Sequence, residues 1–163
     1  MLNLFVFRNF TECEEREMAR LETRNARIPV NVVAEKDTDF DLHDGEECFV
    51  VLFGIGNIVD IYPSKEALYS DNYTMDIPSV IPVGTFPIED TEEPFEESPH
   101  ILFVGKVVRV DFDSEAEDNQ PNYCLTVETL EMTILLYLLH DGPIEVGSIL
   151  RGIAWLFGSI YRA

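Results

Sequence analysis

The chain has very little positive charge. Its 163 residues include 31 aspartates and glutamates but only 11 lysines and arginines, which gives a formal net charge of −20 at pH 7. Binding to nucleic acid or to anionic lipid depends mainly on lysine and arginine. The composition therefore argues against both partners and favours basic proteins or cations, which an acidic surface attracts.

Long apolar runs and targeting signals are also lacking. The longest apolar stretch, around 134–139, is too short to span a bilayer. The first ten residues, MLNLFVFRNF, have no positively charged leader and no small-residue cleavage site, so they make a poor signal peptide. We therefore expect a cytoplasmic protein that has no membrane partner.

Cysteine is scarce and odd in number. Cys13, Cys48 and Cys124 are widely spaced, and no CxxC or Cys/His grouping points to a metal site. Free thiols fit a reducing compartment. We predict no cofactor.

Motifs of known catalytic mechanism are missing as well. The chain has no GxSxG, HExxH, P-loop or dinucleotide-binding fingerprint. His43–Asp44 and His140–Asp141 are adjacent pairs in predicted turns, a spacing at which a base and its orienting carboxylate rarely face each other. An enzyme is therefore the less favoured class, and we name no catalytic residue.

What the chain does have is acidic charge gathered in three segments. Residues 1–27 balance five arginines against five glutamates, so the excess charge lies in residues 28–163. The acidic segments are 35–47, 89–97 and 111–118, and they alternate with segments that carry little charge. This pattern is typical of a β core that has acidic loops.

One acidic segment has the carboxylate spacing with which an EF-hand loop begins. Leu42 and Cys48, however, occupy the positions where an EF-hand needs glycine and a bidentate glutamate. A solvated acidic loop is the favoured interpretation. A nonstandard calcium site is kept as an alternative, with the candidate ligands Asp37, Asp39, Asp41 and Asp44.

The secondary structure is expected to be mainly β with an N-terminal helix. Thr11 and Glu14 form a capping-box pattern, which predicts a helix over 12–25 after a short strand at 2–7. The proline-rich stretch 70–99 is expected to form a loop that wraps the core. Apolar patterns predict strands at 28–34, 48–53, 58–62, 101–112, 123–127, 132–139 and 149–157, and a helical turn at 65–69.

Glycines inside two predicted strands indicate a closed sheet. Gly105 and Gly152 lie mid-strand, where barrels use glycine to bend. The predicted fold class is α+β and mainly β: a small antiparallel OB-like β-barrel centred on 101–158, with an N-terminal helix and a long wrapping loop. The predicted domains are a strand–helix segment at 1–27 and a single β-rich domain at 28–163, whose sub-lobes at about 28–70 and 98–163 are joined by the acidic segment 71–97.

A short internal repeat has two interpretations. Leu42-His43-Asp44-Gly45 recurs at 139–142, and each copy precedes a strand that ends in Leu-Phe-Gly. The repeat indicates either a duplicated half-barrel or a coincidence between two common turn sequences.

The aromatic residues near the C-terminus also have two interpretations. Ile149, Ile153, Trp155 and Phe157 share one face of the last predicted strand, which indicates a core face. Alternatively, Trp155 and Phe157 form a stacking platform with Tyr137 and Tyr161, of the kind that OB-like barrels use for ligands.

Together these features predict a non-catalytic acidic module that binds a basic protein. An inhibitor or immunity-type protein that masks a basic partner is the sharpest form of this hypothesis. The alternative is a β-barrel that binds a small ligand, a sugar or calcium. The predicted partner-binding residues are Glu92, Glu93, Glu96, Glu97, Asp113, Glu115, Glu117 and Asp118.

Overall fold

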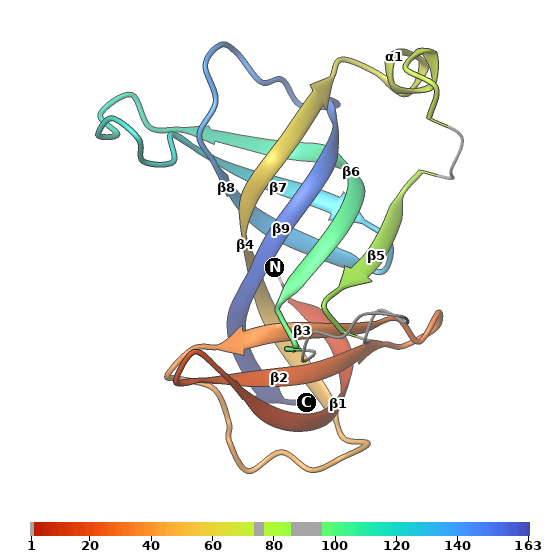
Figure 1. Ribbon diagram of the computed structural model, residues 1–163, viewed down its shortest axis with the longest axis vertical. Helices are drawn as coiled ribbons and strands as arrows, with labels where there is room; N and C mark the ends of the chain where they lie inside the picture. Colours follow the sequence, from red (N-terminus) through yellow and green to blue (C-terminus); the bar gives the residue numbers. More distant parts are fainter. Residues whose placement is uncertain (1, 74–76, 86–95) are drawn as a thin grey trace.

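Strands make up most of the computed structural model, which describes residues 2–73, 77–85 and 96–163 (Figure 1). Among these residues no helix is long and apolar enough to cross a membrane. The elements are β1 (Asn3–Cys13), β2 (Arg16–Thr23), β3 (Pro29–Ala34), β4 (Glu47–Tyr62), α1 (Lys65–Ser70), β5 (Ser79–Val83), β6 (His100–Phe112), β7 (Tyr123–Thr129), β8 (Met132–Leu138) and β9 (Ile149–Arg162).

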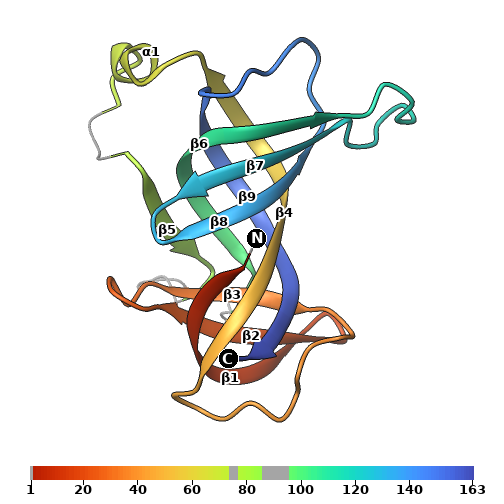
Figure 2. The same cartoon turned by 180° about the vertical axis from the view of Figure 1, so that it is seen from behind.

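Strand pairing closes the sheet into two five-stranded rings that share β4 and β9. The sheet order is β1-β2-β3-β9-β4-β8-β7-β6-β5, with the additional pairings β1–β4 and β9–β6. We call β1-β2-β3-β9-β4 the N-terminal ring and β4-β8-β7-β6-β9 the C-terminal ring. Figures 1 and 2 show the N-terminal ring below the C-terminal ring, with β4 and β9 running through both. A mainly β protein with a closed sheet is therefore confirmed.

The two rings have the same pairing scheme. Each contains one parallel pair, β3–β9 in the N-terminal ring and β4–β8 in the C-terminal ring, and its other pairs are antiparallel. Of the ring strands, β1 to β4 come from the first half of the chain and β6 to β9 from the second. The last strand of the first half, β4, pairs in parallel with β8, and the last strand of the second half, β9, pairs in parallel with β3. Phe53 and Phe157 lie opposite each other where the rings meet. This reciprocal arrangement supports a duplicated half.

The repeated tetrapeptide itself does not mark equivalent turns. Before β4, the backbone N–H of Gly45 donates to the carbonyl of Phe7 at 2.8 Å. Before β9, the matching bond runs from Gly147 to the carbonyl of Val107, also at 2.8 Å. Gly45 and Gly147 have φ angles of 91° and 97°, which glycine adopts without strain. The equivalent of Gly45 is therefore Gly147 and not Gly142 of the second tetrapeptide.

The predicted helix over 12–25 is wrong, because this segment forms the β1–β2 hairpin. Its turn residues, Glu14 and Glu15, have φ angles of 50° and 65°. Positive φ at both central residues is the geometry of a two-residue turn that follows the twist of the sheet. Ala19 and Leu21 are fully buried on the inward face of β2. As a strand, β2 buries these alternate side chains in the core, whereas a helix here would bury only a thin apolar face.

Two further strand predictions need correction. The segments 48–53 and 58–62 belong to the single strand β4, which has a bulge at Ile58, where φ is 53°. The stretch 70–99, expected to be a loop, contains β5. Whether the rest of this stretch wraps the core stays a prediction, and at its described end Asn31 Nδ2 of β3 donates to the carbonyl of Ser98 at 3.3 Å. The helical turn at 65–69 is confirmed as α1.

From Leu150 onward the inward face of β9 is the opposite of the predicted one, whereas Ile149 of the predicted face is buried as expected. Leu150, Ala154 and Leu156 are fully buried in the core. Gly152 shares this face, because a Cβ at this position would lie 2.8 Å from the Cα of Val59. Ile153, Trp155 and Phe157 therefore point outward and are partly exposed. One large cluster of buried side chains fills both rings, and a second, smaller cluster joins Leu68, Val104 and Ile149.

Candidate functional site

An acidic surface lies at the far end of the C-terminal ring. The β6–β7 loop, residues 113–122, and the β8–β9 loop, residues 139–148, both extend from this end, the first to the side and the second upward (Figures 1 and 2). Their carboxylates are all exposed. We call this surface the acidic end and define it by Asp113, Glu115, Glu117, Asp118, Asp141 and Glu145.

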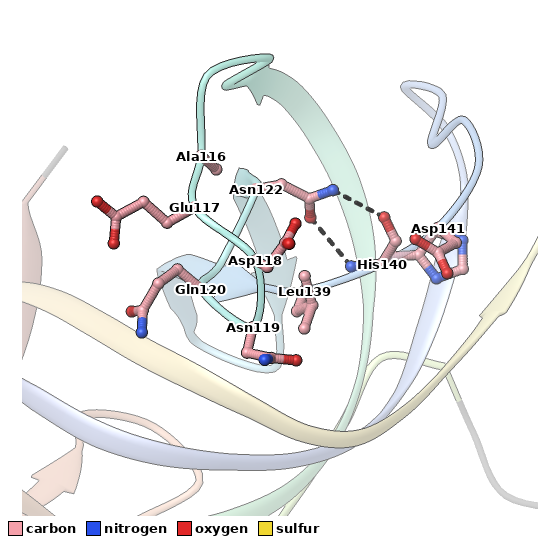
Figure 3. A pocket seen from close by; sticks show the side chains of 9 residues that line it. All are labelled: Ala116, Glu117, Asp118, Asn119, Gln120, Asn122, Leu139, His140 and Asp141. Carbon is pink, nitrogen blue, oxygen red and sulfur yellow. Dashed lines mark hydrogen bonds between the residues drawn. The ribbon is translucent and has the colours of Figure 1, made fainter.

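Hydrogen bonds fix the two loops against each other. Asn122 Nδ2 donates to the carbonyl of His140 at 2.9 Å, and Asn122 Oδ1 accepts from the backbone N–H of His140 at 3.0 Å (Figure 3). The hydroxyl of Tyr123 donates to the carbonyl of Gly142 at 2.7 Å. Within the β6–β7 loop, Asp113 Oδ1 accepts from the backbone N–H of Glu115 at 3.0 Å. The acidic end is therefore a defined surface and not a pair of independent loops.

Two cavities open side by side at the acidic end and share His140. The larger has a volume of about 640 Å³, and its wall is mostly polar (Figure 3). The smaller, of about 350 Å³, is bordered by the exposed side chain of Val146. Leu139 and Val146 have 51% and 63% of their surface exposed, so apolar groups lie among the carboxylates. The larger cavity is lined by Ala116, Glu117, Asp118, Asn119, Gln120, Asn122, Leu139, His140 and Asp141.

The carboxylates of the acidic end form no ion pair with any residue that the structure describes. The ion pairs of the described residues lie elsewhere, and most of them involve arginines of the N-terminal ring. Five of the eleven basic residues of the chain lie in β1, β2 and the turn that follows β2. Three of the described basic residues, Lys106, Arg109 and Arg151, lie in strands of the C-terminal ring, but none of them pairs with the carboxylates that define the acidic end.

The acidic segment 35–47 has the opposite character, because arginines pair with it. It lies at the far end of the N-terminal ring, at the bottom of Figure 1. Arg162 Nε lies 2.8 Å from Glu46 Oε2, and this hydrogen bond lowers the pKa of Glu46. Arg8 Nη1 lies 3.1 Å from Asp44 Oδ1, and Arg24 Nη2 lies 3.1 Å from a carboxylate oxygen of Glu47.

The four candidate calcium ligands do not form a shared cage. Asp37 accepts hydrogen bonds from the hydroxyls of Tyr161 and Ser159, which lower its pKa. Asp39 and Asp44 pair with different arginines, and Asp41 accepts from Arg162 through its backbone carbonyl. In the part of the chain that the structure describes, no group of three or more His, Cys, Asp or Glu side chains is arranged to hold a metal ion.

The predicted partner-binding residues divide between two places. Asp113, Glu115, Glu117 and Asp118 come together at the acidic end. Glu97 instead pairs with Arg20 of β2. Burial raises the pKa of the Cys13 thiol of β1, and the nearby charges of Glu14 and Glu96 raise it further. Glu96 and Glu97 therefore lie against the N-terminal ring. Glu92 and Glu93 lie outside the described residues.

Sequence reasoning missed Asp141 and Glu145, which share the acidic end with the β6–β7 loop. The sequence shows that both residues are acidic. Their place beside the β6–β7 loop depends on the hydrogen bonds between Asn122 and His140, which join two loops distant in the chain. Comparison of the chain with protein-family models, curated proteins and solved structures finds no match.

Proposed function

We propose that the protein is a non-catalytic interaction module that binds a basic protein through the acidic end. The observation that carries this proposal is the contrast in charge compensation. Asp44, Glu46 and Glu47 of segment 35–47 are paired with arginines, whereas the carboxylates at the acidic end have no cationic partner among the described residues. Uncompensated carboxylates on a fixed surface are free to pair with cations of another molecule.

The chemistry of the acidic end suits a protein partner. Exposed carboxylates attract a basic surface over a distance of roughly 10 Å at 0.1 M salt and raise the association rate. Leu139 and Val146 offer apolar area that a partner can bury once it has docked. An inhibitor or immunity-type protein that masks a basic surface is the sharpest form of this function.

Two finer assignments go with the proposal. The C-terminal ring is an OB-like barrel, which its five strands and its ring closure support. OB-folds bind ligands partly through the loop between their first two strands, and the β6–β7 loop has this place in the C-terminal ring. A cytoplasmic location is supported by three free cysteines, Cys13, Cys48 and Cys124, since oxidising compartments favour disulfides.

Two charge variants with the same net charge test the proposal. The acidic-end variant carries Asp113→Asn, Glu115→Gln, Glu117→Gln and Asp118→Asn. The paired-end variant carries Asp39→Asn, Asp44→Asn, Glu46→Gln and Glu47→Gln. Both variants and the wild type are used to capture basic proteins from a lysate at low salt, and association rates with the captured protein are then measured by stopped flow.

The wild type and the paired-end variant should capture the same basic protein, and the acidic-end variant should lose it. The association rate of the wild type should fall steeply as salt is added, and that of the acidic-end variant should depend less on salt. Failure to capture any basic protein would contradict the proposal. Equal losses in both variants would also contradict it, because net charge and not the acidic end would then govern binding.

The larger cavity favours a second candidate, a site for a small polar ligand. Its volume of about 640 Å³ lies within the range of ligand sites, and amide and carboxylate side chains from two loops line it. A panel of neutral sugars tests this candidate by thermal shift. A rise in melting temperature that Asn119→Ala abolishes would favour it over the basic protein, whereas an unchanged melting temperature would rule these sugars out.

A further inference from the structure

A row of aromatic rings crosses the outer face of the sheet where the two rings of strands meet. Tyr137 of β8, Phe53 of β4 and Phe157 of β9 follow one another with ring centroids 6.4 Å and 5.3 Å apart, and both contacts are stacked. Trp155 continues the row, 5.9 Å from Phe157. We call these four residues the aromatic row. Phe53, Tyr137 and Trp155 come from three different strands, so closure of the sheet is what brings them together.

The aromatic row is not part of the core. Its side chains point outward and are partly exposed, while neighbouring residues on the same strands, such as Leu136 and Leu156, are fully buried. Ile55, next to Phe53 on the outer face of β4, has 44% of its surface exposed. Phe53 directly faces Leu135 and Phe157 in the register of the sheet. Aromatic and aliphatic side chains that gather on the outer face of a protein with so many charges indicate a contact surface.

The aromatic row is continuous with the acidic end. A cavity of about 200 Å³ is lined by Tyr137 together with Asp111 and Asp113. Asp111, Cys124 and Tyr137 are successive partners across β6, β7 and β8. A partner segment that leaves the acidic end can therefore pass onto the aromatic row without a break.

Charge decides which occupant suits this face. A second copy of the chain would bring a further net charge of −20 against the first, so self-association is opposed by repulsion. A basic segment has the complementary charge. Rings hold arginine in particular, because its planar guanidinium stacks on aromatic faces and is weakly hydrated.

Contacts between a guanidinium and an aromatic ring already occur within the molecule. The guanidinium of Arg16 lies 6.0 Å from the ring centroid of Trp155, at one end of the aromatic row. The guanidinium of Arg151 lies 5.3 Å from the ring of Tyr62. Phe53, Tyr137 and Phe157 have no such cation among the described residues.

We propose that the aromatic row binds arginine side chains of the basic partner, by packing of each planar guanidinium against the exposed parts of Tyr137, Phe53 and Phe157. This inference rests on the proposed function and names the chemistry of the partner segment. The acidic end then supplies attraction to any basic segment, and the aromatic row supplies a preference for arginine over lysine.

The test compares oligoarginine and oligolysine peptides of equal length. Trp155 is the single tryptophan of the chain and belongs to the aromatic row, so its fluorescence reports directly on binding there. The wild type should bind oligoarginine more tightly than oligolysine. The double variant Phe53→Leu/Tyr137→Leu keeps apolar bulk but removes two rings, and it should lose about two- to tenfold of its affinity for oligoarginine with little change for oligolysine.

Matched variants keep the two proposals apart. Phe40→Leu removes an exposed ring outside the aromatic row and should leave both affinities unchanged. The acidic-end variant should lose affinity for oligoarginine and for oligolysine to a similar extent. Tyr137→Phe retains the ring and should retain the preference for arginine. Melting curves show whether each variant is folded at the assay temperature, and Tyr137→Leu alone replaces the double variant if that variant unfolds.

Each outcome has a definite meaning. A Phe53→Leu/Tyr137→Leu variant that keeps the wild-type preference for arginine, beside an acidic-end variant that binds weakly, would overturn this inference and leave the proposed function intact. An acidic-end variant that binds both peptides like the wild type would overturn the proposed function itself. Loss of the arginine preference in the double variant alone supports the inference.

Discussion

The N-terminal and C-terminal rings share one pairing scheme, yet the loop between their first two strands differs greatly. In the N-terminal ring this loop is the tight Glu14–Glu15 turn. In the C-terminal ring it is the loop 113–122, which carries most of the acidic end. Since both scaffolds are closed in the same way, the difference lies in what the loops present. Binding residues commonly lie on loops that a rigid scaffold positions, and the C-terminal ring fits that pattern.

The rings also differ in how their negative charge is used. Arginines of the N-terminal ring hold the loop 35–46 and the end of β9 in place, as Arg162 does through Glu46. The acidic end has no such internal partners among the described residues. Carboxylates of segment 35–47 are thus paired within the molecule, whereas those of the acidic end form a surface that is open to a partner.

The largest test of the comparison asks whether the rings are stable separately. Phe5 of β1 and Phe103 of β6 are buried in corresponding strands of the two rings. Phe5→Ala and Phe103→Ala should each lower the free energy of unfolding by about 3–5 kcal/mol, because each leaves a cavity in one continuous core. Urea unfolding followed by circular dichroism and by Trp155 fluorescence should show one transition in both variants. A second transition, with only one phase shifted by each variant, would mean that the rings unfold independently.

A smaller effect is expected at the polar link between the rings. Asn3 of β1 is buried, and its side chain donates to the carbonyl of Thr133 at 2.8 Å and accepts from the N–H of Thr133 at 2.7 Å. Asn3→Ala should cost about 1–3 kcal/mol, since it leaves these backbone groups of β8 without partners. Asn57→Ala, at an exposed position of β4, is the control and should change stability by less than about 0.5 kcal/mol. Equal effects of the two substitutions on the urea midpoint would refute the role of Asn3.

Local patterns in the sequence predicted most strands of the C-terminal ring, but they did not predict the closure of the sheet. Tyr123 to Val127 alternates clearly, and the polar loop before it is where the pattern placed it. The helix prediction failed because Met18 and Leu21 have a spacing that fits a helix, and only the core shared with β3 and β9 favours a strand. Local propensity yields to such long-range contacts.

The outward position of Trp155 could not be read from its own strand. Both faces of β9 are apolar, so alternation does not say which one is buried. Gly152 and Gly158 lie on the inward face, where other backbone segments pass so close that no side chain would fit. These close approaches arise only after the sheet closes. For the same reason, the sequence showed the charge of the acidic end but not its separation from segment 35–47.

The two charge variants should also differ from the wild type in stability, in opposite directions and by small amounts, because exposed ion pairs contribute little. The paired-end variant removes partners of Arg8, Arg24 and Arg162, so its melting temperature should fall. The acidic-end variant removes carboxylates that repel one another, so its melting temperature should rise at low salt. Melting curves at low and high salt check both signs, and added salt should shrink both differences. A fall in both variants would mean that the acidic end is internally paired after all.

The smallest expected effect concerns Asp37, a residue of segment 35–47 whose carboxylate is held by hydroxyl groups and, among the described residues, not by an arginine. Hydrogen bonds from the hydroxyls of Tyr161 and Ser159 lower the pKa of Asp37 below its ordinary value of 3.8. A carboxylate with a lowered pKa in the folded state stabilises the fold above pH 3.8, and this contribution is lost as the pH falls through the lowered pKa. Tyr161→Phe removes the larger of the two causes, so its melting temperature should lie below that of the wild type near neutral pH and approach it in acid. Tyr137→Phe, which leaves Asp37 untouched, should show a constant difference from the wild type over the same acid range. A Tyr161→Phe difference that also stays constant with pH would show that the hydroxyl acts through packing alone and not through the charge of Asp37.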